Sequence, residues 1–402
     1  MIRNLFAKLL QHLDRKEFTI ITGARQTGKS TLMRQLNEHC KQNNAPSVFL
    51  NLENKQILND LDASPLNILS YLPDTENRVV VFIDEVQYLK APSNFLKLLY
   101  DEYVHKIKIV ATGSSAFYLD KSFTDSLAGR KRIFWLSPCS FNEYLALRGK
   151  DDLLQEITEI QKNNRYKSLQ IEILRQEWEM FMLFGGYPAV IIEPDRNEKI
   201  LRLAEIRDSF LKRDILESGV QNETAFYNLF QLLASQTGNL LNVNELSSTL
   251  RIKNETVANY LYILQKCFHI SLVKPFFKNL RKELTKMPKV YLHNNGMRNS
   301  LLNNFQPIAE RIDKGMLWEN TVFSLLCEKH NIDEIFFWRT ADDNEVDFVL
   351  PKIQNPQAIE CKYDANMESL TKYKKFIENY PNIPFSFCSY LPFDNDFFRK
   401  RF

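Results

Sequence analysis

Residues 18–31, with the sequence FTIITGARQTGKST, constrain the fold more than any other stretch of the chain. Their first five residues form a short apolar run rich in β-branched side chains, and the segment from Gly23 to Ser30 matches the pattern GxxxxGK[ST]. In this pattern the glycines let backbone N–H groups face phosphate oxygens, and the helix that follows points its N-terminus at the same anion. The stretch therefore predicts a buried strand, a phosphate-binding loop and a helix, in that order.

The residue types in this loop suit a nucleoside triphosphate. We expect Lys29 to bring its positive charge to the β- and γ-phosphates of ATP, and the hydroxyl of Ser30 to bind Mg²⁺. The residues that we expect to line the nucleotide are Gly23, Ala24, Arg25, Gln26, Thr27, Gly28, Lys29, Ser30 and Thr31. The alternative is a chance match of the pattern in a turn, and a second motif at a suitable distance argues against it.

That second motif is VVVFIDE at residues 79–85, a strand-like apolar run that ends in two adjacent carboxylates. Two carboxylates at the end of a buried strand are costly without a cation nearby. We expect Asp84 to hold Mg²⁺ directly or through water, and Glu85 to orient and polarise the attacking water. The two motifs together predict an Mg²⁺-dependent ATPase.

Two further segments carry candidates for contact with the γ-phosphate. The run IVATGSSA contains Ser114 and Ser115. We expect Ser114 to touch the γ-phosphate or the attacking water, and a helix N-cap is the alternative role. In AGRKR, Arg130 is the candidate for the arginine that reaches the γ-phosphate, often from a neighbouring subunit. Surface charge is the alternative for Arg130 and for Arg132.

Short apolar runs in the first third of the chain predict an α/β fold. They are rich in β-branched and aromatic residues, and helical stretches separate several of them, which is typical of a parallel sheet buried on both faces. The runs cover residues 18–22, 48–52, 79–84, 108–112 and 132–136. Residues 141 to about 220 show helical periodicity and predict a helical lid or linker.

Residues 222–293 predict a winged helix, because three helical stretches precede two short strand-like runs. The later part of this segment is rich in lysine and arginine, which suits contacts with DNA phosphates. The residues predicted to contact DNA are Lys253, Lys266, Lys274, Lys278, Arg281 and Lys282, and Lys286 and Lys289 extend the same basic run. The alternative is a protein-contact or subunit-packing module in which the basic run is a solvated face.

A third group of charged residues stands in apolar surroundings near the end of the sequence. Asp347 falls in the strand-like run EVDFVL, and Glu360 and Lys362 share one face of the run IECKY. Carboxylate, carboxylate and lysine is the PD-(D/E)xK arrangement, in which Asp347 and Glu360 would bind Mg²⁺ and Lys362 would position or activate water. Glu319, in the helical segment GMLWENTVFSLLC, matches an acid that some such nucleases add. The alternative is charge on edge strands, where it blocks aggregation.

The motifs also carry a resemblance to known proteins. The order of P-loop, DE and TGSS resembles an AAA-type ATPase of the additional-strand class. With LAGR, LSPCSFNEYL and FGGYPAV, essentially the whole chain resembles one prokaryotic family that joins such an ATPase to a winged helix and a C-terminal nuclease-like domain. The expected fold is thus a P-loop parallel sheet with a helical lid, an α+β winged helix and an α/β restriction-endonuclease-like domain. The expected boundaries are 1–140, 141–221, 222–295 and 296–402.

Composition narrows the function classes further. A net charge of +3 offers no overall basic field, so any sign of a nucleic-acid partner must be local. The six cysteines form no CxxC pair and the six histidines no cluster, which argues against a zinc site and favours a cytoplasmic protein with reduced thiols. The sequence contains no run of about 18 apolar residues, so we expect no membrane partner.

Three functions remain open on these grounds. The first is an ATP-driven DNA-processing enzyme with or without nuclease activity, and the second is an ATP-dependent DNA-binding switch whose nuclease-like domain is inactive. The third is a regulatory ATPase with protein partners only. The expected cofactors are ATP and Mg²⁺, the expected partner is DNA, and an arginine that acts between subunits would imply a ring-type homo-oligomer.

Overall fold

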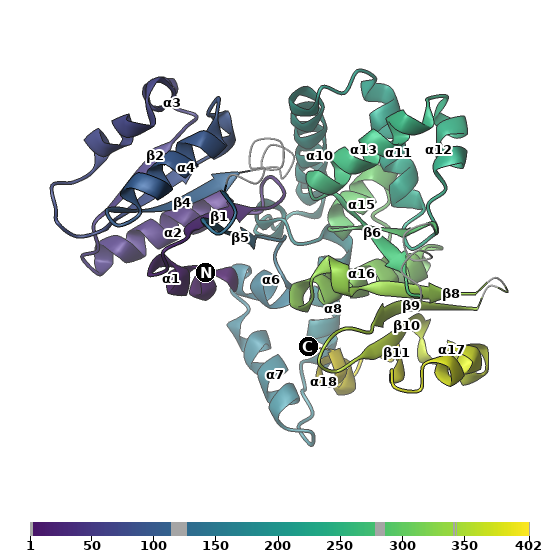
Figure 1. Cartoon of the computed structure of the whole chain (residues 1–402). Coiled ribbons are helices and arrows are strands. Elements are labelled where there is room, and N and C mark those ends of the chain that lie inside the picture. The colour runs from purple at the N-terminus through teal and green to yellow at the C-terminus, as the bar shows by residue number, and fades with distance from the viewer. Residues whose placement is uncertain (1–2, 114–126, 278–285, 341, 343, 402) are drawn as a thin grey trace. The chain divides into compact units, whose positions relative to one another are not determined.

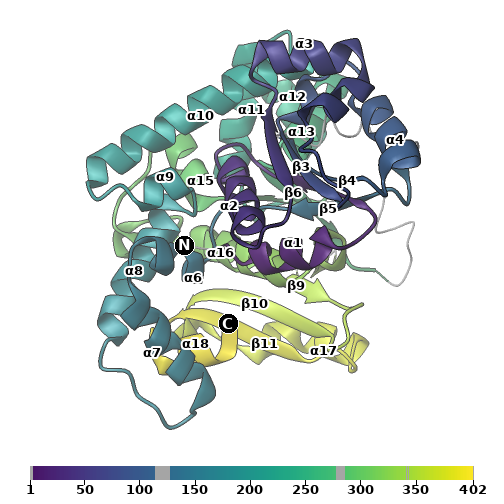
Figure 2. The same cartoon turned by 90° about the vertical axis from the view of Figure 1, so that its left-hand side faces the viewer.

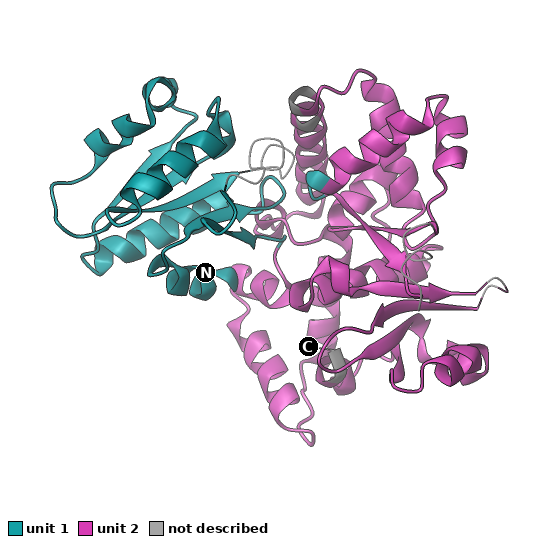
Figure 3. Ribbon diagram, in the orientation of Figure 1, with its two compact units in different colours: residues 1–138, 266–268 teal, residues 139–265, 269–402 magenta. Residues whose placement is uncertain are grey.

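The computed structural model describes residues 3–113, 127–277, 286–340, 342 and 344–401. The chain divides into two compact units (Figure 3). Unit 1 contains residues 1–138 and 266–268, and unit 2 contains residues 139–265 and 269–402. Among the described residues, none of the helices is both long enough and apolar enough to cross a membrane.

Unit 1 is built on a five-stranded parallel sheet with the strand order β2-β3-β4-β1-β5. Its main elements are α1 (Leu5–Leu13), β1 (Phe18–Thr22), α2 (Lys29–Gln42), β2 (Ser47–Asn51), α3 (Lys55–Ala63), β3 (Val79–Asp84), α4 (Pro92–Tyr103), β4 (Ile107–Gly113) and β5 (Lys131–Trp135). The five predicted strands are confirmed, each within a residue of its expected bounds. β4 is inserted between β1 and β3, which is the arrangement that the additional-strand resemblance implies.

Both faces of this sheet are apolar because successive strand residues point to opposite sides. Ile20 and Val81 lie in one hydrophobic cluster with residues of α3 and α4. Ile21 and Phe82 lie in a second cluster with residues of α1 and α2. Figure 2 shows α2 and α4 on opposite sides of the strands. The burial on both faces explains why these runs read as continuous apolar stretches in the sequence.

Unit 2 begins with helices and ends in a second sheet (Figure 1). Its helices are α6 (Phe141–Leu147), α7 (Asp151–Lys162), α8 (Ile171–Phe184), α9 (Pro188–Ile191), α10 (Arg196–Ser218), α11 (Glu223–Ser235), α12 (Val243–Leu250), α13 (Asn254–Lys266), α15 (Asn295–Leu302), α16 (Lys314–Lys329), α17 (Lys374–Asn379) and α18 (Asn395–Arg401). Its strands are β6 (Ile270–Pro275), β7 (Lys289–Leu292), β8 (Phe336–Arg339), β9 (Glu345–Leu350), β10 (Gln357–Asp364) and β11 (Phe385–Leu391). The helical region and the later α+β pattern are therefore confirmed as elements, whereas α18 was not expected.

The six strands of unit 2 form one sheet in the order β11-β10-β9-β8-β6-β7. β6 and β7 pair as an antiparallel hairpin, as a wing would, and β6 also pairs in parallel with β8 through Lys274 and Phe336. The expected boundary between residues 295 and 296 therefore falls between strands of a single sheet. The division into four domains remains a prediction.

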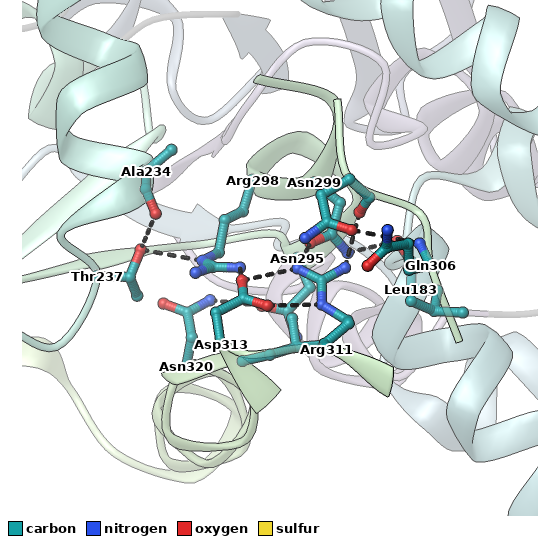
Figure 4. A network of polar contacts seen from close by, with 12 residues as sticks. Leu183, Ala234, Thr237, Asn295, Arg298, Asn299, Gln306, Arg311, Asp313 and Asn320 are labelled. Atoms are coloured by element: carbon teal, nitrogen blue, oxygen red, sulfur yellow. Dashed lines mark hydrogen bonds and ion pairs between the residues drawn. The ribbon is translucent and has the colours of Figure 1, made fainter. Parts of the chain in front are cut away.

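A buried charged network joins the helices beside this sheet (Figure 4). Arg298 and Arg311 are 0 % and 1 % exposed, and both donate to the carboxylate of Asp313 at 2.7 to 2.8 Å. Arg298 also donates to Thr237 at 3.2 Å, and Arg311 donates to the side chain of Asn299 at 3.0 Å. Burial alone would raise the pKa of Asp313, but the hydrogen bonds from the two guanidinium groups outweigh it and lower the pKa to about 2.

Candidate nucleotide site and carboxylate cluster

The loop between β1 and α2 has the backbone geometry that its glycines predict. Gly23 has a φ of +146°, and a Cβ atom at this position would lie 2.3 Å from the carbonyl oxygen of Leu136. Gly28, directly before α2, has a φ of +95°. Both positions therefore require glycine, the first for close approach and the second for conformation. The loop delivers the chain to the N-terminus of α2, where unpaired N–H groups favour an anion.

Lys29 is 5 % exposed and holds its ammonium group over the same loop. Its Nζ donates to the carbonyl oxygens of Gly23 and Ala24 at 3.0 and 2.8 Å. Thr27 donates from its hydroxyl to the oxygen of Ala24 at 2.9 Å, and Arg3 donates to the oxygen of Thr27 at 2.7 Å. The loop is thus braced by its own side chains and by the segment before α1, with a fixed positive charge at its centre.

Oxygen atoms from three elements meet beside this loop. The hydroxyl of Ser30, on α2, donates to Oδ1 of Asp84, on β3, at 3.1 Å. The hydroxyl of Thr112, on β4, donates to the same carboxylate oxygen and accepts the backbone N–H of Glu85 at 3.0 Å. A hydroxyl and a carboxylate side by side are ligands that Mg²⁺ prefers, so this donor set fits the ion.

Thr112 is the polar residue of β4 that reaches this site, and sequence reasoning missed it. The predicted residue, Ser114, and its neighbour Ser115 lie outside the described residues. The threonine stands only two positions earlier in the same run, ATGSS, and its signal was a polar residue inside a buried strand. Such a residue needs a hydrogen-bond partner, and the end of the adjacent acidic strand supplies one.

Glu85 follows β3 with a φ of +61°, which is the left-handed region and rare for a residue with a side chain. Conformations of this kind persist where surrounding contacts hold them, and they concentrate at functional sites. One such contact is the bond from its N–H to Thr112. Gln87, a second residue missed from the sequence, donates from Nε2 to a carboxylate oxygen of Glu85. Glu85, the residue predicted to act on water, is therefore held by hydrogen bonds at both its backbone N–H and its carboxylate.

Arg130 does not face the nucleotide loop of its own chain. β5 runs parallel to β1, with Lys131 opposite Phe18. Arg130 therefore lies at the end of the strands where β1 begins, whereas the loop follows the end where β1 stops. Its Nε forms an ion pair with Asp101 at 2.6 Å. Arg132 lies with its guanidinium 6.0 Å from the ring centre of Phe134. A role for Arg130 would therefore require a neighbouring subunit, and this role remains a prediction.

The second predicted site lies in unit 2, where Asp347 and Glu360 are 7 % and 6 % exposed. Lys362 donates to Oε1 of Glu360 at 2.6 Å, and Tyr373 donates to the same oxygen at 2.8 Å. The other oxygen of Glu360 accepts the N–H of Asp347 at 3.3 Å, and Oδ2 of Asp347 accepts the N–H of Cys361 at 2.9 Å. The structure thus brings the three predicted residues together at the β9–β10 pair.

Lys289 corrects the predicted basic surface. It was expected to extend the basic run that suits DNA-phosphate contacts, which requires an exposed side chain, but it is 1 % exposed. Its Nζ lies 2.5 Å from a carboxylate oxygen of Glu345, 3.2 Å from Asp347 and 3.3 Å from Glu319. Tyr291, two residues further along β7, donates to Glu319 at 2.6 Å. We refer to Glu319, Glu345, Asp347 and Glu360 as the carboxylate cluster.

Burial controls the protonation of this cluster. It raises the pKa of Glu319 to about 8, with the charge of Asp347 adding to the effect and that of Lys289 opposing it. It raises the pKa of Glu360 to about 7, again with Asp347 adding to the effect. Burial alone would lower the pKa of Lys289, but the charges of the three neighbouring carboxylates raise it well above its ordinary value. The ammonium group therefore stays charged.

The cluster does not fit a divalent metal ion in this arrangement. Both side-chain oxygens of Asp347 and both of Glu360, the predicted ligands, already have partners within the protein. Within the part of the chain that the structure describes, no group of three histidine, cysteine, aspartate or glutamate side chains is placed to hold a metal. The predicted metal site at these residues is not supported by the donor set.

The predicted DNA-contact residues are placed unevenly. Lys253, Lys274 and Lys286 have exposed side chains, and Lys266 is half-buried. Lys278, Arg281 and Lys282 lie outside the described residues. Lys286 also lines a cavity of about 380 Å³, together with residues of α12, α13 and β6 and the segment before β7. Lys253 lies directly before α13, Lys274 lies on β6, and Lys286 lies in the segment between β6 and β7.

Three family models match successive parts of the chain. Residues 15–145 match the model of an AAA domain. Residues 175–307 and 314–396 match two models described as domains of unknown function, DUF8612 and DUF4143. The first match covers the five-stranded sheet and its loop, so the chain contains an AAA-type P-loop ATPase domain.

Sequence matches to related proteins cover most of the chain. An uncharacterized protein of Haemophilus influenzae is 25% identical over an alignment of 362 residues that covers 87% of this chain and 83% of the relative. An uncharacterized protein of Mycobacterium tuberculosis is 26% identical over 363 residues, 90% of this chain and 73% of the relative. Each match therefore includes residues of both units of this chain.

Two solved structures show a more distant similarity. The Aeropyrum pernix ORC1 protein in complex with DNA has a TM-score of 0.34 and 11% identity, over 76% of this chain and 93% of that one. Cdc6p from Pyrobaculum aerophilum has a TM-score of 0.31 and 13% identity, over 75% of this chain and 93% of that one. Similarity at this level carries no conclusion about function.

Proposed function

We propose that this chain, which contains an AAA-type ATPase domain, hydrolyses ATP with Mg²⁺ and uses its nucleotide state to control binding to duplex or branched DNA. The observation that carries the ATPase part is the meeting of Ser30, Asp84 and Thr112 beside the glycine loop. The DNA part is supported by the exposed lysines Lys253, directly before α13, and Lys274 and Lys286 of the β6–β7 hairpin. A homo-oligomer in which Arg130 acts on the neighbouring subunit's nucleotide is part of the proposal.

Each residue at the nucleotide site has a distinct role in this proposal. The N–H groups of residues 23–31 and the ammonium of Lys29 would bind the phosphates, and Ser30 and Asp84 would hold Mg²⁺. The ion would supply positive charge that offsets the phosphate oxygens. Glu85 would take a proton from the attacking water, and Thr112 and Gln87 would hold Glu85 in position.

Strand cleavage is not part of the proposal, because the carboxylate cluster does not fit the metal that such chemistry requires. The favoured form is therefore a DNA-binding switch or remodelling ATPase whose C-terminal sheet binds without cutting. A regulatory ATPase with protein partners only is the competing function, and it predicts no change in ATP turnover with DNA.

The first experiment measures ATP turnover alone and with duplex, forked and four-way DNA. We expect DNA of at least one form to change the turnover rate. We expect Lys29→Ala and Glu85→Gln each to lower turnover by about 100-fold or more, because they remove a charge or the base needed in the transition state. Turnover that survives both substitutions would contradict the nucleotide site.

The second experiment measures DNA binding by fluorescence anisotropy. Lys253→Glu combined with Lys274→Glu should weaken binding at least tenfold, because both exposed charges are reversed. Lys162→Glu, at an exposed position on α7, is the matched control and should change the affinity little. No binding of any DNA form by the wild-type chain would leave the protein-partner function as the better one.

A further inference from the structure

We propose that the ammonium group of Lys289 is a built-in cation that fills the place of a metal ion in the carboxylate cluster. The proposal goes beyond the DNA-binding function and holds whether or not the chain binds DNA. It assigns the C-terminal sheet a cation site that the protein supplies from its own β7 strand.

The first observation is the match between donors and acceptors. An ammonium group has three N–H donors, and Nζ of Lys289 meets the carboxylates of three different residues, Glu319, Glu345 and Asp347. The separations of 2.5 to 3.3 Å are hydrogen-bond distances from a nitrogen atom. Each donor therefore has one acidic acceptor.

The second observation is the origin of the four side chains. Glu319 comes from α16, and Glu345 and Asp347 share β9, whereas Lys289 arrives from β7, which lies at the far end of the sheet order from β10 and β11. The lysine contacts glutamate and aspartate residues 30 and 58 positions away in the sequence. A contact that joins three separate elements in this way is part of the folded core rather than a mobile surface pair.

The third observation is the contrast with Lys362, the lysine expected from the sequence to act at this site. The side chain of Lys362 is 23 % exposed and forms an ion pair with Glu360, whereas the side chain of Lys289 is 2 % exposed. A buried carboxylate without a compensating charge costs several kcal/mol. Lys289 is the buried cation that offsets the charge of Glu345 and Asp347.

Charge balance explains why an internal ammonium would exclude a divalent ion. A metal ion needs carboxylate oxygens at about 2.0–2.6 Å that are free to point at it. Here Oδ1 of Asp347 faces Lys289 and Oδ2 faces the N–H of Cys361. A divalent ion added here would share the same carboxylates with the ammonium group. The two cations would then lie close together and repel each other.

The test is a measurement of Mn²⁺ binding to the nucleotide-free full chain by electron paramagnetic resonance of the free ion. An Asp84→Asn background removes the carboxylate of the nucleotide site from every protein compared. We expect the chain with Lys289 to bind no Mn²⁺ at the cluster, so a further Asp347→Asn substitution should not change the bound amount. A bound ion that Asp347→Asn releases would overturn the proposal.

The second arm removes the internal cation. Lys289→Ala opens space beside the three carboxylates, and we expect this variant to bind one Mn²⁺ that is lost again when Asp347→Asn is added. The melting temperature should rise with Mn²⁺ only in Lys289→Ala, by about 5 °C or more at a hundredfold excess over the dissociation constant. Lys286→Ala, at the exposed lysine three positions earlier, is the matched control and should show no such rise.

Both arms give decisive outcomes. A folded Lys289→Ala variant that binds no Mn²⁺ would show that the lysine does not keep a cation out, which also overturns the proposal. If Lys289→Ala does not fold, the first arm still decides, because it compares only chains that retain the lysine. DNA binding plays no part in either readout, so failure here is distinct from failure of the proposed function.

Discussion

At the scale of single residues, Thr112 shows how a buried hydroxyl links two acidic residues with different tasks, one through its carboxylate and the other through its backbone. It donates to Asp84, the residue placed to hold Mg²⁺, and accepts from the N–H of Glu85, the residue placed to act on water. Glu85 adopts a left-handed backbone conformation at this point. The hydroxyl therefore helps to hold Glu85 in a backbone conformation that is rare for a residue with a side chain.

Replacing Thr112 with valine should lower the turnover of ATP by about 10- to 100-fold while changing the affinity for ATP much less. Valine keeps the shape of the side chain but removes both hydrogen bonds, so the backbone of Glu85 loses its acceptor. The measurement compares the turnover number with the dissociation constant of a fluorescent ATP analogue. Equal losses in both quantities would indicate a collapsed loop instead of a misplaced base.

Thr22→Val is the matched control for that substitution. Thr22 ends the neighbouring strand β1 and is 1 % exposed, as deeply buried as Thr112, which is 0 % exposed. Its hydroxyl has no hydrogen-bond partner among the described residues. The same change of chemistry at this position should leave turnover within about twofold, because no oriented bond is lost.

At the scale of elements, the network of Arg298, Arg311 and Asp313 ties α15 and the loop before α16 to the rest of unit 2. Two buried guanidinium groups share a single carboxylate, whose side chain is 20 % exposed. Asp313 is therefore the group that compensates both charges. Loss of that carboxylate would leave two buried cations without their acid.

The stability of unit 2 should depend on pH through Asp313. Its pKa is about 2 in the folded chain against an ordinary value of 3.8, so the stabilisation is fully present above pH 3.8 and is lost as pH falls through 2. A shift of this size corresponds to roughly 2 kcal/mol. Urea unfolding followed by tryptophan fluorescence, from pH 6 to pH 2, measures it.

Asp313→Asn should flatten that pH dependence and cost about 3–5 kcal/mol at neutral pH. Asp342→Asn removes a carboxylate that is 71 % exposed and paired with Lys375, and it serves as the control with a small expected effect. A wild-type profile that stays unchanged when Asp313 is replaced would assign the acid sensitivity to other carboxylates.

The exposed Lys274, on β6 of the β6–β7 hairpin, allows a further prediction. A lysine that contacts a DNA phosphate displaces a counterion, so each such contact adds about 0.9 to the slope of log affinity against log salt. Lys274→Ala should therefore lower the magnitude of that slope by about 1 and weaken binding similarly for every DNA sequence. Lys162→Ala should leave the slope unchanged, and a slope that does not move in either variant would remove β6 from the DNA surface.

The elements show where sequence reasoning succeeds and where it stops. The strands of unit 1 and the glycine loop were predictable because their signals are local: an apolar run, a glycine at a forced conformation, an acid at a strand end. Lys289 was misplaced because it follows a run of lysine and arginine residues in the sequence, whereas its contacts lie 30 and 58 residues away. Thr112 was passed over because burial makes its hydroxyl important, and burial depends on the strand order.

At the scale of the whole molecule, the proposed activities fall in different units. The nucleotide site belongs to unit 1, and the exposed lysines Lys253, Lys274 and Lys286 belong to unit 2. ATP can therefore control DNA binding only if nucleotide and DNA each bind with different affinity to two states of the chain that involve both units. Such a coupling is a free energy, and it acts equally in both directions.

The last prediction tests this coupling in both directions. In the Glu85→Gln variant, which should bind ATP without turning it over, saturating ATP should change the dissociation constant for DNA by a factor of about 5 to 150. Saturating DNA should then change the dissociation constant for ATP by the same factor, because the two binding steps close one thermodynamic cycle. Anisotropy of labelled DNA and fluorescence of an ATP analogue measure the two factors independently. Lys29→Ala should abolish the effect of ATP on DNA binding while leaving DNA affinity without nucleotide unchanged. Two factors of one would mean that the units bind their ligands independently, and the chain would then be an ATPase with a separate DNA-binding unit, not a switch.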